Sequence, residues 1–119
     1  MPLHAQSHGE SFLALAVNRF AGEGLYILDE PEAALSVSGT LALLAIVLRA
    51  AGAGAQFVIA THSPILLAVP GASVYELGAA GVVPTAYDDV DAVRLTRGFL
   101  DAPERYVRAA LDVAKPAHE

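Results

Sequence analysis

Two adjacent carboxylates, Asp29 and Glu30, directly follow a short apolar run at residues 25–28. The run is too short for a typical helix and Pro31 ends it, a pattern typical of a buried parallel strand. Open α/β sheets bind their ligands at the carboxyl ends of such strands. Because successive side chains of an extended chain point to opposite sides, the two acids can address different targets, a Mg²⁺ ion and a water molecule.

Two further groups of polar residues lie at similar places. His62 follows a second apolar run, residues 56–60, and upstream Ser7, Gly9 and Glu10 lie in a turn that opens a helical pattern. A histidine at a strand end either bonds to backbone or reaches a ligand. Ser7 and Glu10 have capping-box spacing, which also suits an ordinary capped helix. A hydroxyl and bare N–H groups at a helix N-terminus make an anion site.

The elements that must position these residues follow from periodicity. The sequence predicts a strand, a helix at about residues 39–51 capped by Ser36 or Ser38, and a second strand, that is, a βαβ unit with parallel strands and a right-handed crossover. A first helix is expected to run from the Ser7 cap to about Phe20. After the second strand we expect a short helix at 63–67, a hairpin of residues 73–77 and 82–85, and helices at about 90–100 and 103–114.

Composition limits the classes of function. The 119 residues suffice for one small domain, and 55% of them are hydrophobic while 17% are charged. The net charge of −6 disfavours nucleic-acid binding by phosphate neutralisation. There is no cysteine, no apolar run long enough for a membrane span and no signal-peptide layout, so a cytoplasmic location is the default expectation.

Taken in order, three motifs resemble the C-terminal half of an ABC-type ATPase nucleotide-binding domain. Residues 6–10 read Gln-Ser-His-Gly-Glu, residues 25–36 read Leu-Tyr-Ile-Leu-Asp-Glu-Pro-Glu-Ala-Ala-Leu-Ser, and residues 56–62 end in Ala-Thr-His. They are similar to the signature motif, the Walker B motif with its D-loop, and the switch histidine. The likeness covers about residues 3 to 112. It implies an α/β fold, a partial P-loop NTPase core of AAA/ABC type with parallel strands, crossover helices and a C-terminal hairpin plus helices, in a single domain portion over residues 1–119.

The resemblance also implies roles for individual residues, with ATP and Mg²⁺ as cofactors. Asp29 would hold Mg²⁺, mostly through its waters, and Glu30 would polarise the attacking water. His62 would sense the γ-phosphate. Phosphoryl transfer to water needs these parts: a metal that neutralises phosphate charge, an oriented water and donors to the γ-phosphate oxygens.

The same resemblance implies a partner. Ser7, Gly9 and Glu10 match the signature motif, which in the family contacts the nucleotide held by the opposite protomer of a head-to-tail dimer. His8 stands where transporters have the first glycine, and its side chain crowds the approach of an anion. Glu10 replaces their glutamine. Residues 32–36 correspond to the D-loop and would touch the partner protomer.

One family motif does not occur in these residues. The sequence contains no Gly-x-x-x-x-Gly-Lys-Ser/Thr loop, and its single lysine, Lys115, stands in no such context. We therefore expect the chain to be the second half of an ATPase, as a fragment, a split gene or a truncated reading frame, with weak or no ATP binding alone. The strand at 56–60 would then have an open apolar edge, which predicts self-association or dependence on a partner, either a homodimer or a complementary ATPase half.

Three other hypotheses compete with an ATPase half-site. The first is a non-catalytic remnant or regulatory subunit that pairs with an ATPase. The second is a metal-dependent hydrolase in which Asp29, Glu30 and His62 bind a divalent ion directly, although this ligand set is sparse. The third is a Ser-His-Asp hydrolase built from Ser63, His62 and Asp29, which lacks the Gly-x-Ser-x-Gly motif.

Overall fold

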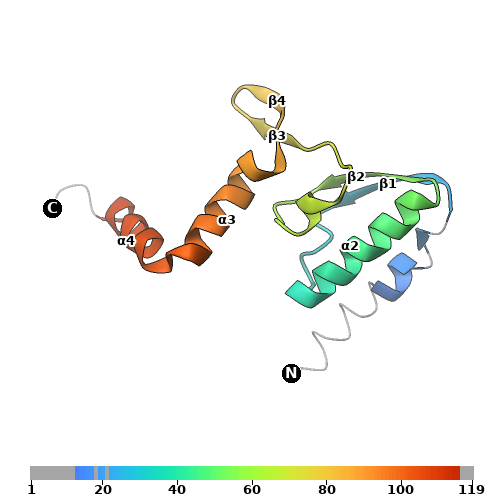
Figure 1. The fold of residues 1–119 in the computed structure, drawn as a ribbon, viewed down its shortest axis with the longest axis horizontal. Coiled ribbons are helices and arrows are strands. Elements are labelled where there is room, and N and C mark those ends of the chain that lie inside the picture. Colours follow the sequence, from blue (N-terminus) through green and yellow to red (C-terminus); the bar gives the residue numbers. More distant parts are fainter. Residues whose placement is uncertain (1–12, 18, 21, 116–119) are drawn as a thin grey trace. The chain divides into compact units, whose positions relative to one another are not determined.

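The computed structural model describes residues 13–17, 19–20 and 22–115 (Figure 1). These residues form two units, one that ends at Ser73 and one that begins at Val74. Each unit is described by itself below. In the part of the chain that the structure describes, no helix is long and apolar enough to cross a membrane.

The first unit is built on a parallel pair of strands. Strand β1 (Gly24–Asp29) is followed by helix α2 (Val37–Gly52) and strand β2 (Ala55–Ala60), and the two strands pair in parallel from Gly24 opposite Ala55 to Asp29 opposite Ala60. The predicted strand–helix–strand order and the parallel pairing are confirmed. Residues 13–17 and 19 are helical, as predicted, whereas the predicted start of that helix at Ser7 lies outside the described residues.

The core of this unit lies on one face of the sheet. Strand alternation directs Tyr26 and Leu28 of β1, and Phe57 and Ile59 of β2, to the face where they pack against the buried cluster that includes Leu43 of α2. The cluster also contains Ala16, Phe20, Val47, Ala50, Ala55 and Leu66. Helix α2 therefore covers this face of the sheet (Figure 1).

The opposite face of the sheet is apolar and open in this unit. Leu25 is 61% exposed, Ile27 74% and Val58 58%, and Ile27 lies directly opposite Val58. Among the described residues the sheet has only these two strands, so the outer edge of each has no strand neighbour. Parallel sheets are normally covered on both faces. The open face and edges are therefore surfaces on which a further layer of structure fits.

A side-chain cap determines where α2 begins. Ser36 has extended backbone angles, and its Oγ accepts a hydrogen bond of 3.1 Å from the N–H of Gly39. Of the two serines predicted as caps, the structure thus selects Ser36. The bond satisfies one of the N–H groups that the first turn of a helix leaves without a partner.

We expect Ser36→Ala to lower the free energy of unfolding by about 1 kcal/mol, because the mutant leaves the Gly39 N–H without its acceptor. Urea denaturation followed by circular dichroism measures this loss. Ser38→Ala is the matched control, because the Ser38 hydroxyl bonds to the Ser36 hydroxyl and not to the N–H of Gly39. Equal losses in both variants would contradict the capping role.

The loop after β2 differs in detail from the predicted helix at 63–67. The structure has a turn followed by a short 3₁₀ helix, η1 (Leu66–Ala68). The Ser63 hydroxyl accepts hydrogen bonds from the N–H groups of Ile65 (3.2 Å) and Leu66 (3.3 Å). This local capping holds the chain in a turn and shifts the helical segment toward the C-terminus.

The second unit combines a hairpin with two short helices. Strands β3 (Tyr75–Gly78) and β4 (Gly81–Pro84) are antiparallel, and a 3₁₀ helix, η2 (Tyr87–Asp89), leads to α3 (Asp91–Asp101) and α4 (Pro103–Val113). The hairpin and both helices agree with the predicted boundaries within about two residues. The Glu76 carboxylate accepts a hydrogen bond of 2.8 Å from the N–H of Asp91 and so caps α3 from the hairpin.

Candidate functional site

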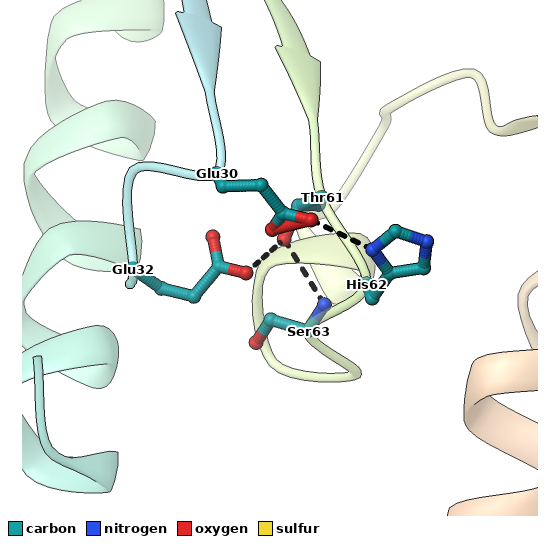
Figure 2. A network of polar contacts seen from close by, with 5 residues as sticks. All are labelled: Glu30, Glu32, Thr61, His62 and Ser63. Atoms are coloured by element: carbon teal, nitrogen blue, oxygen red, sulfur yellow. Dashed lines mark hydrogen bonds and ion pairs between the residues drawn. The ribbon is translucent and has the colours of Figure 1, made fainter. Parts of the chain in front are cut away.

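The ends of β1 and β2 place two loops side by side. Asp29 lies opposite Ala60 in the parallel register, and the N–H of Glu30 donates a hydrogen bond of 2.7 Å to the carbonyl oxygen of Ala60. The residues that follow the two strands, near Glu30 and near His62, therefore meet at the same edge of the sheet. Figure 2 shows the side chains that gather there.

Glu30 and His62 are in direct contact. Nδ1 of His62 lies 2.7 Å from Oε1 of Glu30, and the His62 side chain is 89% exposed. An ionised carboxylate can only accept, so Nδ1–H donates, and in the neutral ring Nε2 is then an acceptor. Glu30 has a positive φ of 47°, which is uncommon for a residue other than glycine and is often found at functional sites.

The contact affects the acidity of Glu30. The hydrogen bond from His62 holds the pKa of Glu30 below its ordinary value of 4.5, and a side-chain hydrogen bond from Glu32, which only a protonated Glu32 can donate, acts next in the same direction. A carboxyl group whose pKa is depressed in the folded state stabilises the fold above its ordinary pKa. That stabilisation is lost as the pH falls through the lowered pKa, so the contact is expected to be complete at neutral pH and to disappear in acid.

We expect His62→Ala to raise the pKa of Glu30 back toward 4.5, because the mutant removes the largest cause of the shift. The midpoint of the Glu30 carboxyl ¹³C resonance in an NMR titration measures the change. Glu104→Ala, which removes a carboxyl group in the first turn of α4, is the matched control and should leave the Glu30 midpoint unchanged. A Glu30 midpoint that does not move on mutation would refute the contact.

A second set of hydrogen bonds joins the same two loops. Oε2 of Glu32 accepts a bond of 2.8 Å from the Thr61 hydroxyl, whose oxygen in turn accepts a bond of 3.0 Å from the N–H of Ser63 (Figure 2). From the sequence, Glu32 is expected only in a D-loop that touches a partner, and Thr61 has no predicted role. The available signal was an acid two residues after Glu30 and a hydroxyl one residue before His62, at the ends of neighbouring strands.

Asp29 occupies a different position from Glu30. It ends β1, is exposed, and by alternation lies on the open face of the sheet with Leu25 and Ile27. Mg²⁺ is usually held by one or two carboxylates while it keeps several waters, so a single exposed carboxylate fits such an ion. In the part of the chain that the structure describes, no group of three or more His, Cys, Asp or Glu side chains could hold a metal.

The structure does not bring together the predicted Ser-His-Asp set. Ser63 Oγ accepts from the amides of the following turn, and Nδ1 of His62 engages Glu30 instead. Figure 2 shows the Ser63 hydroxyl pointing away from the His62 ring. The predicted signature residues Ser7, Gly9 and Glu10 lie outside the described residues.

Comparison with known proteins places part of the chain in a family. Residues 8–68 match the family model described as "AAA domain, putative AbiEii toxin, Type IV TA system". No curated protein and no solved structure matches the chain. The matched segment contains β1, α2, β2 and all five side chains of Figure 2. The chain therefore belongs to this family of AAA domains, which are nucleotide-binding, NTPase-like modules.

Proposed function

We propose that this chain supplies one half of an ABC-type Mg-ATP hydrolysis site. The observation that carries the proposal is the contact of 2.7 Å between Glu30 and His62 at the carboxyl ends of two parallel strands. Ligands of α/β sheets bind at this edge. Here an acid and an imidazole, both accessible to solvent, meet in a segment that belongs to an AAA-domain family.

Each residue then has a distinct task in hydrolysis. Glu30 orients the attacking water and accepts a proton from it. The protonated ring of His62 donates a hydrogen bond to the terminal phosphate through Nε2, the ring nitrogen that does not bond to Glu30. Asp29 would hold Mg²⁺ through the ion's waters. The ion, when bound, neutralises phosphate charge. Because Asp29 and Glu30 project in different directions, the metal ligand and the water-orienting acid do not compete.

The phosphate-binding loop must come from outside these 119 residues, since they contain no Gly-x-x-x-x-Gly-Lys-Ser/Thr motif. We propose that a complementary Walker A segment covers the open face of the sheet. Support comes from alternation: Leu25, Ile27 and Asp29 share that face, so a layer that covers the apolar residues also meets the proposed metal ligand. In an assembled dimer, Ser7, Gly9 and Glu10 would contact the nucleotide of the opposite protomer.

The open face also predicts how the chain behaves alone. We expect self-association that increases with concentration, and expect the double variant Ile27→Thr/Val58→Thr to weaken it, because threonine keeps strand propensity but removes apolar surface. Sedimentation velocity measures the change. Leu77→Thr, at an exposed position of β3, is the control and should associate as the wild type does. A wild-type chain that stays monomeric at high concentration would refute the role of this face.

Nucleotide binding tests the function directly. Calorimetric titration of the purified chain with Mg-ATP is expected to show no binding, because backbone amides and the lysine of a Walker A loop supply most phosphate contacts. Binding is expected to appear when a polypeptide carrying a Walker A strand, loop and helix is added. Turnover by the chain alone would overturn the half-site proposal.

The missing Walker A loop also favours a second candidate, a non-catalytic subunit that pairs with an intact ATPase. The two candidates differ in one outcome. If Glu30 only supports structure, ATP turnover by the assembled complex will not change in Glu30→Gln. If Glu30 orients water, turnover will fall as described in the Discussion.

A further inference from the structure

We infer that Glu32, acting through Thr61, is a positioning residue that holds His62 in place. The inference deepens the proposed function, because it concerns the same histidine, and it rests on hydrogen bonds between residues of this chain. Glu32 lies on the loop after β1 and Thr61 on the loop after β2, and their side chains are joined by a hydrogen bond of 2.8 Å. This bond ties the two loops together across the sheet edge (Figure 2).

The Glu32 end of this bond is anchored by its own turn. The N–H of Ala33 donates to the carbonyl oxygen of Glu30 (3.1 Å), and the N–H of Leu35 donates to that of Glu32 (2.9 Å). When Glu30 and Glu32 are both ionised, neither carboxylate can donate to the other, and the buried Oε1 of Glu32 has no donor among the described residues. In that state the side-chain donor that holds the partly buried Glu32 carboxylate is the Thr61 hydroxyl. Loss of a hydrogen bond that offsets the burial of a charge is expected to displace the charged side chain and the loop that carries it.

At the Thr61 end, hydrogen bonds involve the residues on both sides of His62. The hydroxyl has one proton, which goes to Glu32, and its oxygen accepts from the N–H of Ser63 at 3.0 Å. Ser63 then caps the turn that leads to η1. The residues before and after His62 are therefore fixed by one connected network that begins at Glu32.

His62 itself has little packing that could fix it. Its side chain is 89% exposed, so its direction depends on its backbone and on the contact with Glu30. If Glu32 and Thr61 set that backbone, loss of their bond will release the ring from Glu30 while leaving β1 and β2 paired. A role in folding alone would instead leave the ring contact unchanged in any variant that still folds.

NMR of the His62 ring in the full chain tests this without nucleotide. Long-range ¹H–¹⁵N spectra in mildly alkaline buffer report which ring nitrogen carries the proton, and loss of the signals in His62→Gln assigns them. In the wild type we expect the Nδ1–H form to dominate, because Nδ1 donates to Glu30. Glu30→Ala provides the spectrum of a released ring.

Thr61→Val, which keeps the side-chain shape but removes the hydroxyl, is expected to move the His62 ring signals at least half of the way to the Glu30→Ala positions. Thr61→Ser retains the hydroxyl and should restore the wild-type spectrum. Thr85→Val removes a hydroxyl that bonds only to the hairpin carbonyl of Val83, and should leave the ring unchanged. Should Thr61→Val fail to fold, Glu32→Met removes the acceptor at similar length and is expected to give the same shift.

A folded Thr61→Val or Glu32→Met protein with wild-type His62 ring signals would overturn the inference. This outcome is independent of the proposed function, since the experiment contains no ATP. Conversely, an assembled chain that never binds ATP would refute the proposed function and leave the ring result as it stands.

Discussion

Glu30→Gln is expected to lower the rate of ATP hydrolysis by about two to four orders of magnitude in the chain assembled with a Walker A segment. Glutamine has the same shape and can still accept the hydrogen bond from His62, so the sheet edge stays intact. It cannot take up a proton from water. Mg-ATP binding should therefore stay close to that of the wild type while turnover is lost.

Phosphate release under single-turnover conditions separates these two effects, because it measures hydrolysis after binding is complete. Glu104→Gln, the same chemical change in the first turn of α4, is the matched control and should hydrolyse at the wild-type rate. Undiminished hydrolysis by Glu30→Gln would exclude Glu30 as the water-orienting acid and would favour the non-catalytic subunit.

Leu43→Ala is expected to lower the free energy of unfolding by about 3 kcal/mol or more. Leu43 is 0% exposed and belongs to the buried cluster between α2 and the sheet, which also contains Val47 and Phe20. Truncation removes apolar burial and leaves a cavity. A unit of this size has a small stability margin, so the loss is a large fraction of the total.

Leu41→Ala is the matched control on the same helix. Leu41 is 50% exposed, so the same truncation should cost well under half as much as at Leu43. Urea denaturation followed by far-ultraviolet circular dichroism measures both variants. Similar losses at the two positions would mean that the core does not lie between α2 and this face of the sheet.

Local signals in the sequence accounted for most elements of the fold. Some signals depend on neighbouring residues alone. These are the apolar runs of strand length, the serine cap before residues 37–52 and the glycine-containing turn at residues 78–81. The error at residues 63–67 has the same origin. A serine and a proline are compatible with both a helix start and a turn, and the bonds of Ser63 to Ile65 and Leu66 favour the turn.

The site was predicted in part. The motif pattern indicated Glu30 and His62 as separate functional residues, and the parallel arrangement implied that they lie at the same edge of the sheet. The motif pattern did not predict that Glu30 and His62 touch, nor that a bond between Glu32 and Thr61 joins their loops. These contacts link residues about thirty positions apart, and their distances depend on the register between β1 and β2 and on the left-handed backbone of Glu30.

The sequence by itself therefore determined the local elements, the acid pair after the first strand, the histidine after the second and the absence of a Walker A motif within these residues. Only the tertiary structure decided that Glu30 bonds to His62, that Glu32 bonds to Thr61, and that Asp29 lies on the open apolar face. The physical reason is the distance in sequence between the residues that interact. Helix caps and strand periodicity arise from nearby residues, whereas a hydrogen bond between two loops exists only after the strands have paired in one register.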